Sequence, residues 1–121
     1  SIESIMRPQR LFKVKDFLQP ADGEPVRSVI TESADTAVVA WYVKTGQHIS
    51  AHVHPDGQDT WTILSGCGEY RLSAVGESIA IAQGDVLVAH RRDVHAVLNT
   101  GQETLVFVSV VSPATSGFEL V

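Results

Sequence analysis

Residues 48–61 read HISAHVHPDGQDTW, with histidines at positions 48, 52 and 54 and a carboxylate at position 59. Side chains two residues apart in a β-strand point to the same face of the sheet, so His52 and His54 are expected to point the same way. Imidazole and carboxylate groups are ligands for divalent transition metals. The spacing therefore indicates that this stretch is one wall of a metal site.

A further histidine lies far along the chain. His95 belongs to the segment HRRDVHAVLN (90–99), which follows the turn-bounded segment GDVLVAH (84–90). A closed sheet can bring this segment beside residues 52–54, although a single inward histidine is more often a hydrogen-bonded core residue than a ligand. Two imidazoles on one strand, a carboxylate and a third imidazole from a distant strand would form a metal site with room for solvent.

The rest of the sequence alternates between strand and turn patterns. Segments rich in β-branched and aromatic residues predict strands at 36–44, 48–54, 59–65, 69–75 and 103–111. Turn signals containing glycine separate them, at 65–68, 74–77, 82–85 and 99–102. The segment VKDFL (14–18) fits a short helical turn or an edge strand. These patterns predict a small antiparallel all-β barrel or jelly roll.

Length and composition narrow the class of protein. A chain of 121 residues is expected to form one domain with a single core. The net charge of −5, with only the pair Arg91 and Arg92 as a basic cluster, argues against nucleic-acid binding. No run is long enough for a membrane span and no signal-peptide pattern is present, so a cytoplasmic protein is expected. A lone Cys67 excludes an internal disulfide and a thiol-only metal site.

The region 46–66 resembles the first motif of the cupin family. That motif is a glycine, five residues, His-x-His, three or four residues, a glutamate, six residues and a second glycine. Here Gly46, His52, His54, Asp59 and Gly66 stand at those spacings, with aspartate in the place of glutamate.

The region 84–99 resembles the second cupin motif. That motif is a glycine, five residues, Pro-x-Gly, two residues, a histidine, three residues and an asparagine. Gly84, His95 and Asn99 fit these spacings, while His90 and Arg92 replace the usual proline and glycine. Two motifs in register are more specific than a His-x-His alone.

The resemblance implies a fold and a site. The fold would be a double-stranded β-helix, that is, a jelly-roll barrel, formed by one domain over residues 1–121. Residues 1–35 would be an N-terminal arm with outer strands, 36–111 the barrel core, and 112–121 a C-terminal strand or tail. The family's metal ligands carry over to His52, His54, Asp59 and His95.

The fourth ligand is open at this point. Asp59 is one methylene shorter than glutamate, and Gln58 stands at the shorter spacing that the motif allows. Residues 58 and 59 are expected to face opposite sides of the strand, so only one of them should bind unless the chain bulges. We prefer Asp59 because its distance to Gly66 is correct, and three histidines without a fourth protein ligand remain an alternative.

The metal and its pocket follow from the same resemblance. Fe, Mn, Ni, Cu and Zn all accept imidazole ligands, so the residues do not select among them. A substrate pocket beside the metal is expected from inward side chains, although core packing is the simpler interpretation of each aromatic. The candidates are Trp61, Ile63, Tyr70, Phe107 and Trp41, with His90 or His48 as a proton-transfer group at the mouth.

The implied function is that of a metal-dependent enzyme acting on a small organic metabolite. Oxidoreductase chemistry of the dioxygenase type comes first, and isomerase or lyase chemistry follows. A binding or sensor module that holds a small molecule without turnover is the alternative, and a metal-free relic of the fold is a third. Fold alone does not decide among them.

Two of the expected strands are apolar on both faces. AVVAWYV (37–43) and LVFVSVV (105–111) lack the alternation of a strand with one solvated face. Their second face could be covered by the N-terminal arm or by a second copy of the chain. We favour a homodimer.

Overall fold

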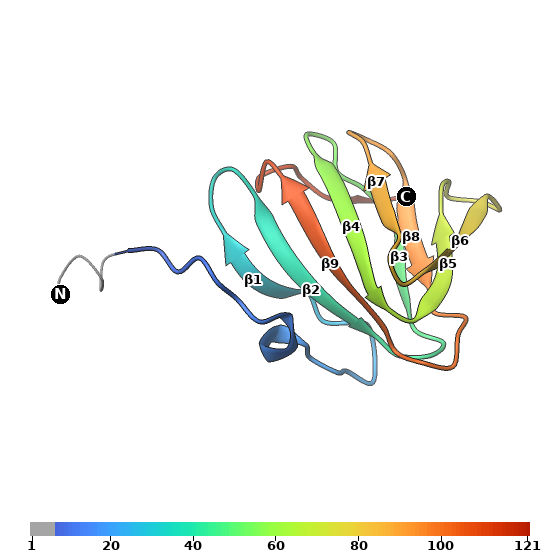
Figure 1. Ribbon diagram of the computed structural model, residues 1–121. Coiled ribbons are helices and arrows are strands. Elements are labelled where there is room, and N and C mark those ends of the chain that lie inside the picture. The colour runs from blue at the N-terminus through green and yellow to red at the C-terminus, as the bar shows by residue number, and fades with distance from the viewer. Residues whose placement is uncertain (1–6) are drawn as a thin grey trace.

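The computed structural model describes residues 7–121, and within them the chain is almost entirely strand and turn (Figure 1). No helix in this part of the chain is long and apolar enough to cross a membrane. The elements, in chain order, are η1 (Val14–Phe17, a 3-10 helix), β1 (Ser28–Glu32), β2 (Ala37–Val43), β3 (His48–Val53), β4 (Gln58–Ser65), β5 (Cys67–Arg71), β6 (Ser78–Ala82), β7 (Val86–Ala89), β8 (His95–Leu98), β9 (Leu105–Ser112) and β10 (Glu119–Leu120).

The strands form two five-stranded sheets that face each other. One sheet has the order β1-β2-β9-β4-β7 and the other β10-β3-β8-β5-β6, and the strand pairings in both are antiparallel. Neighbours such as β2 and β9, or β3 and β8, are far apart in sequence, so each sheet depends on long-range pairing. The all-β jelly-roll expectation is confirmed.

One strand ends earlier than its sequence pattern indicates. The apolar pattern predicts a strand to residue 75, whereas β5 ends at Arg71 and residues 72–76 form bends. The hydroxyl of Ser73 donates a hydrogen bond to the carbonyl of Val75, and the Leu72 amide donates to the carbonyl of Glu77. These two bonds close a turn. The strand ends here because a serine side chain offers backbone groups a local hydrogen-bond partner in place of strand pairing.

Inward-facing apolar side chains of the two sheets form what we call the apolar core. Across the β4–β9 pair, Ile63 stands opposite Phe107, and one step along β4 the Trp61 ring stacks on Phe107 with centroids 4.2 Å apart. The core consists of Val43, Trp61, Ile63, Tyr70, Ile81, Leu87, Val97, Leu105 and Phe107. It fixes the spacing of the two sheets and therefore the place of the polar residues beside it.

The outer face of the first sheet is covered only in part. Gln19, in the arm beyond η1, donates a hydrogen bond to Ser28, and Ser28 and its cross-strand neighbour Ala40 are both buried. The segment at 14–17 is thus a 3-10 turn and not an edge strand. On β7, farther across the same face, Val86 and Val88 are exposed.

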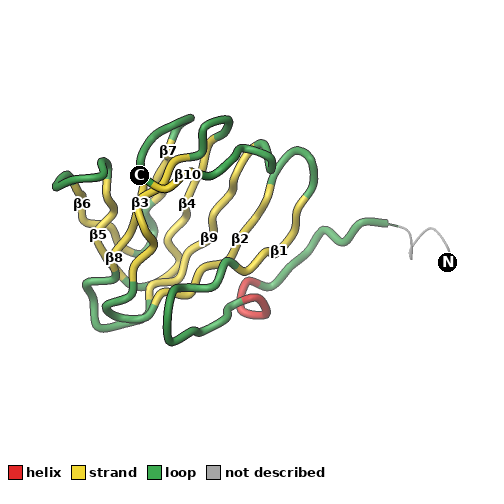
Figure 2. Tube along the Cα trace, turned by 180° about the vertical axis from the view of Figure 1, so that it is seen from behind, coloured by secondary structure: helices red, strands yellow, loops and turns green. Residues whose placement is uncertain are grey.

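The C-terminal residues return to the second sheet. Strand β10 pairs with β3, with Leu120 opposite His52 and Glu119 opposite Val53 (Figure 2). Strand β3 pairs on its other side with β8, where His52 stands directly opposite His95. This register brings the histidines of the two sequence motifs together.

Candidate metal centre

Four side chains predicted as ligands converge between the two sheets. His52 and His54 come from β3 and the residue after it, His95 comes from β8, and Asp59 comes from β4 in the facing sheet. One ligand atom from each lies within 4.8 Å of all the others. The ring centroids of His52 and His95 are 4.1 Å apart, as their cross-strand pairing requires.

The three imidazole rings are held by backbone carbonyl groups. The Nδ1 atoms of His52, His54 and His95 lie 2.7, 2.7 and 3.1 Å from the carbonyl oxygens of Ser50, Gly117 and Asp93, respectively. A carbonyl accepts but does not donate, so each Nδ1 carries a proton, and in the neutral form of the ring the Nε2 atom is the one that can bind a metal. Metal-binding histidines in proteins are commonly fixed in this way.

The Asp59 carboxylate links the histidines to the facing sheet. Its side chain is buried, and Ser109 on β9 donates a hydrogen bond of 2.6 Å to Oδ1. The other oxygen, Oδ2, lies 3.0 Å from His95 Nε2 and 3.3 Å from His54 Nε2. The carboxylate therefore faces the same point as the histidine nitrogen atoms.

The surroundings shift the pKa values of these groups in different directions. Burial acts to raise the pKa of Asp59, but hydrogen bonds from two histidines and Ser109 outweigh it and hold the pKa well below its usual range. Burial and the neighbouring His95 lower the pKa of His52 to about 4. For His54, burial is outweighed by the bonds to Asp59 and Gly117, and its pKa is raised. Asp59 is thus ionised and His52 neutral at pH 7, which are the forms that bind metals.

Gln58, the alternative fourth ligand, lies on the other side of β4. Its side chain is exposed, and its amide nitrogen is 3.3 Å from the hydroxyl oxygen of Thr60, which shares its face. Strand alternation is regular here, so no bulge brings Gln58 into the cluster beside Asp59.

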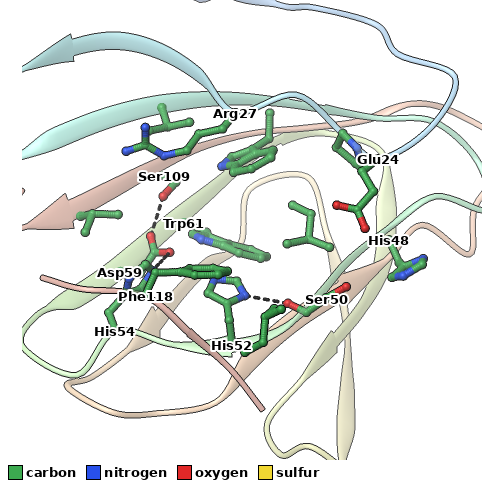
Figure 3. A pocket seen from close by; sticks show the side chains of 16 residues that line it. Glu24, Arg27, His48, Ser50, His52, His54, Asp59, Trp61, Ser109 and Phe118 are labelled. Atoms are coloured by element: carbon green, nitrogen blue, oxygen red, sulfur yellow. Dashed lines mark hydrogen bonds and ion pairs between the residues drawn. The ribbon is translucent and has the colours of Figure 1, made fainter.

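A pocket of about 370 Å³ opens beside the four residues. Figure 3 shows His52, His54, Asp59 and Trp61 in its wall. Within residues 7–121 the lining consists of Glu24, Pro25, Arg27, Val39, Trp41, His48, Ile49, Ser50, His52, His54, Asp59, Trp61, Ser109, Val111, Phe118 and Leu120. A volume of this size is typical of small-molecule sites.

The pocket differs from the one expected from sequence. Ile63, Tyr70 and Phe107 point inward as expected, but they belong to the apolar core and do not line the pocket. Burial raises the pKa of Tyr70, in keeping with that place. His90 is in an exposed turn, where its backbone amide donates to Asp93. Sequence alternation identifies inward positions but not which of them border a cavity.

Several pocket residues were missed because they come from segments outside the two motifs and the predicted strands. Glu24, Pro25 and Arg27 lie in the segment just before β1, while Phe118 and Leu120 lie near the C-terminus. Neither segment carries a motif or a strong strand pattern. The one feature of the sequence that could have indicated a role is that Arg27 and Phe118 each stand among small and polar residues.

The C-terminal segment also supports the metal ligands. The Gly117 carbonyl is the hydrogen-bond partner of His54, and the Phe118 ring lies over His52 with centroids 5.0 Å apart. Ser116 packs so closely against Gly57 that a Cβ atom at position 57 would lie 2.2 Å from the Ser116 Cβ. The segment is therefore fitted to the β3–β4 turn.

The sequence also matches a family model. Residues 39–111 match the model described as "Cupin domain", so the chain belongs to the cupin family. The match spans both sequence motifs and the strands that carry the four clustered residues.

Solved structures agree with this family. An uncharacterized conserved protein with a double-stranded β-helix domain from Klebsiella pneumoniae is 44% identical, with a TM-score of 0.91 over 94% of this chain and 98% of that one. KdgF from a Halomonas species is 20% identical (TM-score 0.68; 78% and 85% covered). A predicted oxalate decarboxylase from Thermotoga maritima is 18% identical (TM-score 0.66; 79% and 97% covered). The last two share the fold, and a search of curated proteins gives no match.

The residues present fit a divalent metal. Three imidazole nitrogen atoms and one carboxylate, brought within one small volume, form a donor set that suits Fe, Mn, Ni, Cu and Zn. All three rings are already oriented by backbone carbonyls, so little rearrangement is needed on binding.

Proposed function

We propose that this cupin binds one divalent transition metal through His52, His54, His95 and Asp59 and acts on a small organic metabolite in the adjoining pocket. The observation that carries the proposal is the convergence of three oriented imidazoles and a buried carboxylate at the wall of a cavity. A purely structural cluster would not need an adjoining pocket.

The bound metal would act as a Lewis acid for an oxygen atom of the substrate. The residues of this chain would orient the metal ligands and shield the substrate. Ser109 holds the Asp59 carboxylate in place, and the backbone carbonyls hold the imidazoles. Apolar walls from Trp41, Ile49 and Phe118 would exclude water from the substrate.

The reaction proposed is oxidoreductase chemistry of the dioxygenase type, with isomerase or lyase chemistry as the second possibility. The donor set and the free space beside it support either, since both require a substrate oxygen next to the metal. The alternative is a binding or sensor module with the same pocket. Such a module differs from an enzyme in that a bound ligand stabilises the protein against unfolding but no product is formed.

The experiment compares metal-loaded protein, chelator-treated protein and the His52→Ala/His95→Ala variant against a panel of small metabolites. Thermal stabilisation reports binding, and O₂ uptake together with mass spectrometry reports turnover. An enzyme gives a product that requires metal and both histidines. Stabilisation with no product for every binding compound would favour the sensor, and metal-independent effects would contradict the proposal.

Two further expectations belong with this proposal. We propose a homodimer in which the outer face of the first sheet, from the apolar strands β2 and β9 to the exposed valines of β7, meets the same face of a second copy. Sedimentation equilibrium measures its mass. A monomer at all concentrations would contradict it.

We also propose a cytoplasmic location, since no apolar run of the sequence reaches the length of a membrane span. Cell fractionation tests this location.

A further inference from the structure

The charged groups that line the pocket are not evenly distributed. Figure 3 shows Arg27 on the side of Ser109 and Asp59, whereas Glu24 and His48 lie at the other end. Among the residues that the structure describes, Arg27 is the only lysine or arginine in the lining. A fixed positive charge therefore stands near the four clustered residues, and the negative charge of Glu24 stands away from them.

Arg27 is free to bind a ligand. Its guanidinium is 3.9 Å from the Glu32 carboxylate, beyond hydrogen-bond distance, and both side chains are about half exposed, at 53% and 52%. An exposed pair at that distance contributes little energy, so the guanidinium gives up little when it turns to another anion. Its planar group of donors suits a carboxylate particularly well.

The walls between the charged ends are apolar. Val39, Trp41, Ile49, Val111 and Phe118 all contribute to the lining. Such walls favour a substrate with an aromatic or branched hydrocarbon body over a sugar, whose hydroxyl groups would lose hydrogen bonds to water.

A second, independent observation concerns Trp61. Its indole Nε1 is the one buried side-chain nitrogen or oxygen atom without a hydrogen-bond partner among the residues that the structure describes. An unpaired buried donor is costly, and an acceptor oxygen of a bound molecule would satisfy it. Figure 3 shows the Trp61 ring beside Asp59, so an acceptor oxygen bound there would lie on the same side as Arg27.

From these observations we infer that the pocket selects a small organic carboxylate with an apolar body, held between the metal centre and Arg27. The inference rests on the proposed metal site and adds the class of substrate. Arg27 is the specificity-determining residue, because it distinguishes a carboxylate from a neutral amide of the same shape. Trp61 contributes a second donor.

The test uses zinc-loaded full-length protein and two probes of matched shape, benzoate and the neutral benzamide. Calorimetry measures their dissociation constants for the natural sequence, Arg27→Gln, Arg27→Lys and Glu24→Gln. Glu24→Gln is the matched control, because it removes a charge from the same pocket at the other end. Zinc content is measured in each sample by elemental analysis, so the metal site and the carboxylate site are tested separately.

The expected result is that benzoate binds at least about tenfold more tightly than benzamide, and that Arg27→Gln removes this preference without changing zinc content. Arg27→Lys should restore part of it, and Glu24→Gln, which removes a negative charge, should not weaken it. Acetate should bind more weakly than benzoate, since it lacks the apolar body.

The inference is overturned if benzoate does not bind, if benzamide binds equally well, or if Arg27→Gln leaves the preference unchanged while zinc is bound. Failure to take up zinc is a different result, because it contradicts the metal site itself. Trp61→Phe provides a further check. It keeps an aromatic ring but removes the N–H, and a lower benzoate affinity with unchanged zinc content is expected.

Discussion

The pocket and the apolar core are built from the same strands, yet they do different work. Along the β4–β9 pair, Asp59 and Trp61 stand opposite Val111 and Ser109, and one step farther Ile63 stands opposite Phe107. The first residues border the pocket and the last two are sealed in the core. Strand alternation directs all of these side chains inward. Whether a side chain lines the pocket or is enclosed in the core therefore depends on the residues that other segments pack against it.

Trp61 is the residue where the two regions meet. It is 2% exposed and packs on Phe107, but it also lines the pocket. Its ring is 5.2 Å from Tyr70 on one side and 5.7 Å from His95 on the other. If this division is correct, substitutions in the core should reduce stability and spare the metal, and substitutions at the pocket should do the reverse.

The largest effect is expected from Phe107→Ala. Phe107 is fully buried in the core, and a change from phenylalanine to alanine typically costs about 3–5 kcal/mol through the cavity that it leaves. Chemical denaturation should show this loss in the free energy of unfolding. The metal content of the folded fraction should stay unchanged, and a large loss of metal from folded protein would break the separation between the two regions.

The next effect is expected from shortening the C-terminal segment. A chain ending at Ser116 loses the Gly117 carbonyl that orients His54, and loss of such outer partners typically lowers metal affinity about 10- to 100-fold. Competition with a chelator measures the affinity. Phe118→Ala is the control, since it keeps the Gly117 carbonyl, and equal losses in both would show that the ring and not the carbonyl matters.

A smaller effect is expected from acid in the metal-free protein. The pKa of His52 is about 4 in the folded protein and 6.5 when exposed, so between these values the unfolded state binds more protons. The contribution of His52 to stability is therefore complete above pH 6.5 and falls as the pH is lowered towards 4.

Denaturation of chelator-treated protein at pH 7 and pH 5 measures this effect. The difference between the natural sequence and His52→Asn isolates His52, because His54, with its raised pKa, has the opposite dependence in both proteins. The natural sequence should lose more stability at pH 5 than the variant. An equal or smaller loss would show that His52 is not buried in its neutral form.

The smallest effect is expected from Arg92→Gly. Arg92 has a backbone φ of 69°, in the left-handed region that costs most residues roughly 1–2 kcal/mol, whereas glycine adopts it freely. The gain is partly offset by the greater freedom of glycine in the unfolded chain, so we expect stabilisation of up to about 1 kcal/mol. The Arg92 amide, which donates to the His54 carbonyl, is retained, and metal affinity should not change.

Much of the site was accessible from the sequence. The alternation of β3 and β4 places His52 and His54 on one face and separates Asp59 from Gln58. The position of His95 could not be obtained from alternation, because its pairing with His52 depends on two strands separated by some forty residues; there the resemblance to cupins supplied it. Gly66 has a φ of 81°, which explains why the motif requires glycine there.

Other features could not be read from local pattern. Ile63, Tyr70 and Phe107 have the same inward alternation as pocket residues, and only the packing of the facing sheet shows that they are enclosed. Arg27 and Phe118 line the pocket because the segments before β1 and after β9 both border it. That arrangement follows from the pairing of β1 with β2 and of β10 with β3, which no short motif records.

The most direct test of the central claim is the metal content of untagged protein purified without chelator, measured by elemental analysis beside His52→Ala/His95→Ala and the core variant Ile63→Val. We expect close to one transition-metal ion per chain in the natural sequence and in Ile63→Val, and none in the double variant. No metal even after reconstitution, or equal metal in the double variant, would contradict the assignment of His52, His54, Asp59 and His95 as a metal centre.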